Sequence, residues 1–190
     1  MRLNGKRIVL GVTGGIAAYK VCDLVRRLVE QEVEVHVMMT RAAQQFVTPL
    51  TFQALSGRPV HTELFSLTEE QEIGHIALAN LADLLLIAPA TADLLAKAAH
   101  GICDDIVTTV LCATKAPVLL VPSMNVNMWN HPVTQENVTK LKKIGYQILD
   151  PSEGPLACGT EGKGRLPEPE MILHACEKII LPARGKVRSI

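Results

Sequence analysis

Three side chains capable of chemistry stand in separate segments of the chain: the imidazole of His75, the carboxamide of Asn125 and the thiol of Cys158. His75 comes just before a short helical pattern that leads into an apolar run, and Asn125 follows a second such run. Glycines stand near Cys158, at Gly154, Gly159 and Gly162, and a mobile backbone of this kind lets a thiol move over a site as part of a lid. Each also has a structural interpretation: helix capping or solvation for His75, termination of a strand for Asn125 and an incidental loop position for Cys158.

Two apolar runs end in the same way, with a proline followed by small or polar residues. Leu84–Ala88 leads into Pro89-Ala90-Thr91-Ala92-Asp93, and Val118–Val121 leads into Pro122-Ser123-Met124-Asn125-Val126-Asn127-Met128-Trp129. In open α/β sheets, ligands bind in the crevice at the carboxyl ends of the strands. Small residues there let a flat ring approach the backbone, so the two strand ends favour a shared flat ligand.

The polar and aromatic residues of these strand ends have alternative structural roles. Thr91 and Asp93 can bond the edge of a ring or cap the following helix. Met124 and Trp129, the only tryptophan, can simply pack in the core.

A glycine turn, Gly11-Val12-Thr13-Gly14-Gly15-Ile16, joins the first strand to a helix and predicts a phosphate site at the helix N-terminus. Its spacing is not G-x-G-x-x-G, and the second strand ends in Met39-Thr40-Arg41 without an acidic residue for an adenosine ribose. Lys20 stands between Tyr19 and Val21, which does not match a Walker lysine. A mononucleotide therefore fits this turn better than NAD or ATP.

Strand-length apolar runs alternate with helical patterns, which predicts a single-domain α/β fold with a Rossmann-like or flavodoxin-like doubly wound parallel sheet between two helical layers. Thr48-Pro49 predicts a helix start and Gly145 predicts a helix stop. The expected strands are Arg7–Val12, Glu34–Met39, Leu84–Ala88, Val118–Val121 and Tyr146–Leu149, with a weaker one near Val60–Leu64. The expected helices are Ile16–Glu30, Pro49–Leu55, Ile76–Leu81, Asp93–His100, Asp105–Ala113, Pro132–Ile144 and Glu170–Leu181.

The stretch from Asp150 to Pro169 is rich in glycine and proline, and we expect it to be a long functional loop that acts as a lid. Residues 182–190 resemble a linker, so we expect a domain of residues 1–181 followed by a linker-like tail. The natural gene product could continue past residue 190. A chain of 190 residues suits one domain of ordinary size.

Composition argues against several classes of function. Nineteen basic residues balance nineteen acidic ones and only six residues are aromatic, which disfavours nucleic-acid binding. The five cysteines form no C-x-x-C pair, which argues against zinc and against a disulfide framework. We expect no metal, no membrane span and no signal peptide, and hence a cytoplasmic protein.

Five segments, in order and with matching spacing over residues 5–181, resemble the homo-oligomeric flavin-containing cysteine decarboxylases. They are Thr13-Gly14-Gly15-Ile16-Ala17-Ala18-Tyr19-Lys20, Gly74-His75-Ile76, Pro89-Ala90-Thr91-Ala92-Asp93, Pro122–Trp129 and Ala157-Cys158-Gly159. The resemblance implies FMN as the cofactor and 4′-phosphopantothenoyl-cysteine as the substrate, with 4′-phosphopantetheine and CO2 as products. It also implies a trimer, or a dodecamer of trimers, and a fused or separate phosphopantothenate–cysteine ligase domain.

The resemblance also implies roles for individual residues. His75 would be the catalytic base, Asn125 would hold the substrate carboxylate and Cys158 would donate a proton in the last step. Ala157 and Arg165 would also contact the substrate. The residues expected at the flavin and its phosphate are Thr13, Gly14, Gly15, Ile16, Thr40, Pro89, Ala90, Thr91, Asp93, Ser123 and Met124.

The chemistry accounts for such a set of groups. Direct loss of CO2 from an N-acyl cysteine leaves a carbanion without an electron sink, whereas prior oxidation of the thiol to a thioaldehyde through the flavin provides one. Decarboxylation then gives an ene-thiolate, which must be reduced by the same flavin and protonated. An oxidative peptidyl-cysteine decarboxylase would release the ene-thiol without the lid cysteine, and a non-catalytic flavin-binding regulatory subunit would not need His75, Asn125 and Cys158 together.

The chain departs from the family pattern at three positions. Thr160 stands where the family commonly has Asp, Asp93 where relatives often have Asn, and Ser123 where this branch often has Ala. None of these changes removes a proposed catalytic group. They bear on loop closure and on contacts with the flavin.

Overall fold

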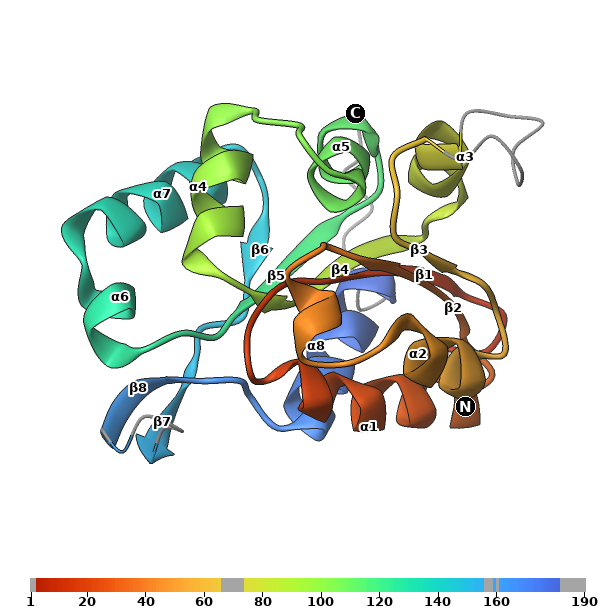
Figure 1. The fold of residues 1–190 in the computed structure, drawn as a ribbon, viewed down its shortest axis with the longest axis horizontal. Helices are drawn as coiled ribbons and strands as arrows, with labels where there is room; N and C mark the ends of the chain where they lie inside the picture. Colours follow the sequence, from red (N-terminus) through yellow and green to blue (C-terminus); the bar gives the residue numbers. More distant parts are fainter. Residues whose placement is uncertain (1–2, 66–73, 156–158, 160, 182–190) are drawn as a thin grey trace, which may run out of the picture.

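The chain folds around one parallel sheet of six strands (Figure 1). The computed structural model describes residues 3–65, 74–155, 159 and 161–181. Buried apolar side chains on both faces explain why the central strands read as continuous hydrophobic runs. From one edge to the other, the strands are β3 (Val60–His61), β2 (Glu34–Met39), β1 (Arg7–Val12), β4 (Leu84–Ala90), β5 (Val118–Pro122) and β6 (Gln147–Ile148).

Helices cover both faces of the sheet and make a three-layer sandwich, which confirms the predicted fold class (Figure 1). Alternate residues of each strand enter two separate cores, for example Leu86 on one face and Leu85 on the other. One face carries α1 (Ala18–Glu30), α2 (Pro49–Ser56) and α8 (Pro169–Ile180). The other carries α3 (Gly74–Leu81), α4 (Ala92–His100), α5 (Ile106–Ala113), α6 (Val126–Asn130) and α7 (Pro132–Lys143), while the 3-10 turn η1 (Ala43–Gln45) follows β2.

The strand order reverses between β1 and β4, which are neighbours in the sheet although β2 and β3 separate them in sequence. The loops that leave such a pair run to opposite sides and open a crevice between them. The glycine turn follows β1, and the first proline-containing strand end belongs to β4. The two segments predicted to bind a ligand therefore lie at the topological switch point.

The predicted lid loop between Asp150 and Pro169 contains an antiparallel hairpin, which the sequence did not indicate. Its strands are β7 (Ser152–Pro155) and β8 (Glu161–Arg165). Glycine and charged residues replace the apolar alternation that normally identifies strands, so periodicity could not reveal them. Gly162 has a φ of 145°, and a Cβ there would lie 2.6 Å from Cγ2 of Val126, so close packing on α6 requires glycine.

Other boundaries differ by a few residues. His75 lies in the first turn of α3, whereas a position before the helix was expected. Thr48 does occupy the N-cap position before Pro49, but its hydroxyl caps no helical N–H and contacts the Thr51 hydroxyl at 3.2 Å. Gly145 follows α7 with a φ of 101°, as a helix stop requires.

Asp83 and Arg7 fasten the amino ends of β1 and β4 together. The Arg7 N–H donates to Asp83 Oδ2 at 2.8 Å, the Asp83 N–H donates to the Arg7 carbonyl at 2.9 Å, and the guanidinium lies 3.5 Å from the same carboxylate. Burial alone would raise the pKa of Asp83, but the Arg7 N–H and guanidinium outweigh it and hold that pKa below its ordinary value of 3.8. This contact sets the register of the two strands that carry the ligand-facing turns.

We predict that Asp83→Asn lowers the free energy of unfolding by about 1 kcal/mol at pH 7. The amide oxygen can still accept from the Arg7 N–H, but the neutral side chain no longer forms an ion pair with the Arg7 guanidinium. The folded-state pKa is depressed, so the carboxylate stabilises the protein above pH 3.8 and this contribution is lost as the pH falls through the folded-state pKa. Urea unfolding of the wild type and of Asp83→Asn from pH 7 to pH 2 measures the difference between their free energies of unfolding. A difference that stays constant over this range contradicts the assignment.

Candidate active site

A cavity of about 780 Å³ opens at the carboxyl edge of the sheet, over β1, β2 and β4. This volume lies within the range of small-molecule sites in proteins. Five of the residues predicted to bind the cofactor line it: Thr13, Gly14, Thr40, Thr91 and Asp93. The remaining lining residues are Arg41, Ala42, Gln45, Ala92, Leu94, Lys97, Asp104, Asp105, Thr108 and Met128.

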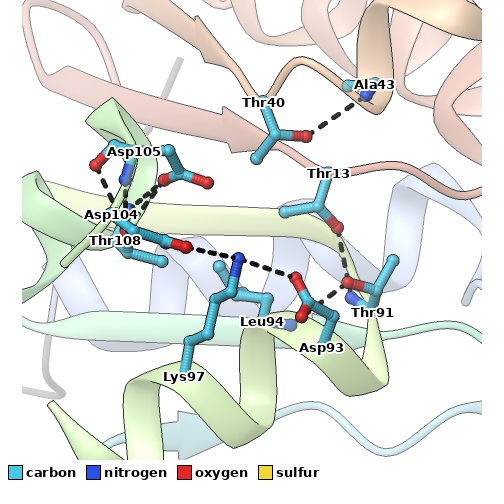
Figure 2. Close-up of polar contacts among 10 residues, drawn as sticks. All are labelled: Thr13, Thr40, Ala43, Thr91, Asp93, Leu94, Lys97, Asp104, Asp105 and Thr108. Carbon is cyan, nitrogen blue, oxygen red and sulfur yellow. Dashed lines mark hydrogen bonds and ion pairs between the residues drawn. The ribbon is translucent and has the colours of Figure 1, made fainter. Parts of the chain in front are cut away.

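Thr13 joins the end of β1 to the end of β4 (Figure 2). Its buried hydroxyl donates to the Pro89 carbonyl at 2.6 Å and accepts from the Thr91 N–H at 3.1 Å. Thr91 in turn caps α4 by accepting from the Leu94 N–H at 3.3 Å. One hydroxyl thus holds the glycine turn, the proline turn and the start of α4 in a single arrangement.

The glycine turn is held close to the segment that follows β2. A Cβ on Gly14 would lie 2.4 Å from the Ala42 Cβ, so only glycine fits there, whereas a Cβ on Gly15 would meet nothing nearer than 3.6 Å. Thr40 accepts from the Ala43 N–H at 3.2 Å and so orders the Ala42 segment (Figure 2). No side chain caps α1, and its first turn carries no acidic residue. Such a helix start suits an anion.

Charged residues form one wall of the main cavity (Figure 2). The Lys97 ammonium lies 3.2 Å from Asp93 Oδ2 and 3.1 Å from Asp104 Oδ2. The Asp104 carboxylate is the largest cause of a raised Lys97 pKa, so this ammonium stays charged at neutral pH. Asp105 accepts from the Thr108 N–H at 2.8 Å in a capping box that starts α5.

Sequence reasoning did not place Lys97, Asp104, Asp105 or Thr108 at the site. Asp105 carried a signal, because an acidic residue before an apolar periodic segment is typical of a helix start. Nothing in the sequence pairs Lys97 with Asp104, since that contact depends on how α4 turns into α5.

A second cavity of about 350 Å³ lies between the start of α1 and the hairpin. It brings together three predicted residues, Ile16, Ser123 and Arg165. The Ser123 hydroxyl donates to the Gly164 carbonyl at 3.2 Å, and the Arg165 guanidinium pairs with Glu168 at 3.2 Å. Its other lining residues are Ala17, Tyr19, Lys20, Pro155 and Leu166.

The two proline-containing strand ends lie side by side, because Ala90 pairs with Pro122 and its carbonyl accepts from the Ser123 N–H at 3.2 Å. The Met124 N–H donates to Gly164 at 3.0 Å, which joins this strand end to the hairpin. Asn125 caps α6 by accepting from the Asn127 N–H at 2.8 Å.

Trp129 is buried beneath these strand ends, with the Lys163 ammonium 5.7 Å from its ring centroid. The packing interpretation of this residue therefore holds.

Neither of the two predicted catalytic residues that the structure describes, His75 and Asn125, lines these cavities. His75 is half-buried in α3 and lines neither cavity, and its buried Nδ1 has no hydrogen-bond partner among the described residues. A buried polar atom of this kind requires an explanation beyond packing. Ala157 and Cys158 lie outside the described residues.

Within the described residues, no group of three or more His, Cys, Asp or Glu side chains could hold a metal ion. In the same part of the chain, no helix is long and apolar enough to cross a membrane.

Fold and site together define a doubly wound α/β protein with an anion-suited turn and a ligand-sized cavity at its switch point. A family model described as Flavoprotein matches residues 1–181. The chain belongs to the Flavoprotein family.

Curated relatives share about half of their residues with the chain. A coenzyme A biosynthesis bifunctional protein CoaBC of Vibrio vulnificus (strain YJ016) is 50% identical over 188 residues, which cover 99% of this chain and 47% of that protein. A protein of the same name from Bacillus subtilis (strain 168) is 48% identical over 189 residues, with 97% and 47% covered. The chain therefore spans about half the length of the curated relatives it matches.

Solved structures share the fold over nearly their whole length. A mutant PPC decarboxylase complexed with pantothenoylaminoethenethiol has a TM-score of 0.82 and 29% identity, with 90% of this chain and 96% of that chain covered. The FMN-dependent cysteine decarboxylase SpaF has a TM-score of 0.81 and 30% identity, with 96% and 99% covered.

We predict that Thr13→Val lowers the free energy of unfolding by about 3 kcal/mol, because the Pro89 carbonyl and the Thr91 N–H each lose a partner. Thr13→Ser keeps the hydroxyl and should cost about 1 kcal/mol, the value of one lost methyl group. Urea denaturation of the three proteins measures both effects. Equal losses in the two variants would show that Thr13 contributes only packing.

Proposed function

We propose that the chain is an FMN-dependent decarboxylase that converts 4′-phosphopantothenoyl-cysteine to 4′-phosphopantetheine and CO2, a step of coenzyme A biosynthesis in the cytoplasm. The observation that carries the proposal is the main cavity, which begins at the glycine turn and continues along the end of β4. The names of the relatives support the same reaction, since they describe coenzyme A biosynthesis proteins and a PPC decarboxylase.

The residues of the glycine turn and of the main cavity fit FMN. The N–H groups of Gly14, Ile16 and Ala17 have no acceptor among the described residues, and a phosphate supplies acceptors for such groups. Thr40 and Thr91 line the same cavity. Gly15, Pro89, Ala90, Ser123 and Met124 complete the proposed set, joined to it by the backbone contacts of the two strand ends.

FMN would supply the two-electron oxidation that turns the substrate thiol into a thioaldehyde, the electron sink needed for loss of CO2, and would return the electrons afterwards. His75 would accept the proton lost during oxidation, and its buried Nδ1 without a partner among the described residues is consistent with that role. The carboxamide NH2 group of Asn125 is the donor that would bind the substrate carboxylate. Cys158 would supply the final proton.

Arg165 offers a cation for the acidic substrate at the second cavity, which also adjoins Ser123 of the proposed flavin set. Ala157 would contact the substrate from the same segment of the chain as Cys158. We also propose a trimer or a dodecamer of trimers, together with a phosphopantothenate–cysteine ligase that is fused or separate.

An oxidative peptidyl-cysteine decarboxylase remains the alternative from the same family. It is less well supported, because the relatives near 50% identity described above are coenzyme A biosynthesis proteins.

We predict that His75→Asn and Cys158→Ala fail at different steps. Without its base, the His75 variant should bleach bound FMN at least about 100-fold more slowly than the wild type when substrate is added. The Cys158 variant should bleach FMN at the wild-type rate, because its thiol acts only in the last protonation, and the reduced flavin should then persist. Rapid mixing with substrate, followed by flavin absorbance, separates the two.

Cys103→Ala, which removes an exposed cysteine that lines neither cavity, is the matched control and should behave as the wild type. Identical flavin traces for His75→Asn and Cys158→Ala would contradict the assigned roles. A wild-type protein that binds FMN but shows no bleaching with substrate would overturn the proposed reaction.

A further inference from the structure

Lys97 is the one cation that joins two elements of the main cavity wall within the described residues (Figure 2). It projects from the second turn of α4 and bonds Asp93 in the first turn of that helix. It also bonds Asp104, which lies beyond the end of α4 and directly before the N-cap of α5. One ammonium therefore spans the junction between the two helices.

The surroundings hold Lys97 in this position. Its side chain is only 23% exposed, and its carbonyl accepts from the Ile102 N–H at 3.0 Å where the chain leaves α4. Gly101 adopts a φ of 69° there and turns the chain back towards the cavity. Asp104 consequently arrives beside Lys97 rather than pointing away from the helix.

The three carboxylates of this wall, Asp93, Asp104 and Asp105, have different partners. Asp105 is used in the α5 capping box, whereas Asp93 and Asp104 have Lys97 as their ion-pair partner. Asp93 belongs to the strand end that follows Pro89, so its position depends on Thr13 and Thr91 as well as on Lys97. The ammonium thus connects the proline turn to the start of α5.

We propose that Lys97 is a positioning residue for the bound cofactor: it holds Asp93 and Asp104 together and thereby sets both the shape and the charge of this wall. The proposal rests on FMN being the ligand of the main cavity. It concerns a residue that the resemblance gave no role, and it requires no particular substrate.

The charge of the wall gives the proposal a measurable consequence. Among the residues that line the cavity, two cations, Arg41 and Lys97, face three carboxylates, which leaves a net charge of −1. Replacing Lys97 with a neutral residue makes this −2. Extra negative charge disfavours both the phosphate dianion and the electrons added to a reduced flavin. FMN should then bind less tightly and should be harder to reduce.

The test uses the purified holoprotein and compares the wild type with Lys97→Met, which keeps most of the apolar stem and loses the ammonium. We expect the Kd for FMN, measured by the fluorescence of FMN released on dilution, to rise about fivefold, as loss of about 1 kcal/mol requires. The midpoint potential of bound FMN should become more negative. Lys97→Arg keeps a cation within reach of both carboxylates and should restore both values.

Two further variants separate positioning from charge and from general stability. Lys97→Met/Asp104→Asn returns the wall to a net charge of −1 without the bridge, so its midpoint potential should move back towards the wild type while FMN binding stays weak. Lys143→Met removes an exposed lysine of α7 that does not line the cavity, and should change neither quantity.

The proposal is overturned if Lys97→Met unfolds at a lower temperature but binds FMN as the wild type does, because Lys97 would then only stabilise the helix junction. It is equally overturned if the midpoint potential of Lys97→Met is unchanged. A wild-type protein that binds no FMN would instead refute the proposed function. Normal FMN binding without decarboxylation would refute the reaction and leave the Lys97 result standing.

Discussion

The hydroxyl of Thr13 is the contact on which the site depends most. It bonds the chain on both sides of Ala90, the last residue of β4, at the Pro89 carbonyl and at the Thr91 N–H, although 76 residues separate Thr13 from Pro89. The bond crosses the switch point of the sheet, where strand order leaves a crevice but does not by itself close it. Because Thr13 joins the two turns, the diverging loops form a defined cavity wall. Thr91, which caps α4, fixes the start of that helix against the same wall.

The rest of the site builds outward from this junction. β5 ends beside β4, so Ser123 bonds the Ala90 carbonyl, and Met124 then bonds the hairpin at Gly164. On the other side, the ion pair between Lys97 and Asp104 joins α4 to the start of α5. The main cavity thus has a hydroxylated side near the glycine turn and a charged side near α5. This division suits a ligand with an anionic end and an extended polar body.

Much of the fold could be predicted because buried parallel strands are short continuous apolar runs with proline or glycine after them. That signal predicted β1, β4 and β5 and the turns that follow them, whereas β2 was predicted although it contains Glu34 and His36 and no proline or glycine follows it directly. The hairpin of β7 and β8 was not predicted, because its glycine and charged residues show no hydrophobic period.

The ion pair between Lys97 and Asp104 could not be predicted from the sequence for a different reason. It is a tertiary contact set by the turn at Gly101, and a helix with i,i+4 charges usually indicates only a solvated face. Conversely, the assignment of His75 and Cys158 rests on family resemblance, because neither residue type at its position is specific by itself. The buried Nδ1 of His75 is the structural observation that sequence could not supply.

Product analysis tests the central claim most directly. The purified holoprotein, with FMN bound, is incubated anaerobically with 4′-phosphopantothenoyl-cysteine, and the products are identified by mass spectrometry. The account predicts 4′-phosphopantetheine and CO2 in equal amounts over many turnovers without added oxidant, because the electrons taken from the thiol return to the product. An ene-thiol two hydrogens lighter, or unchanged substrate beside a flavin-loaded protein, would contradict it.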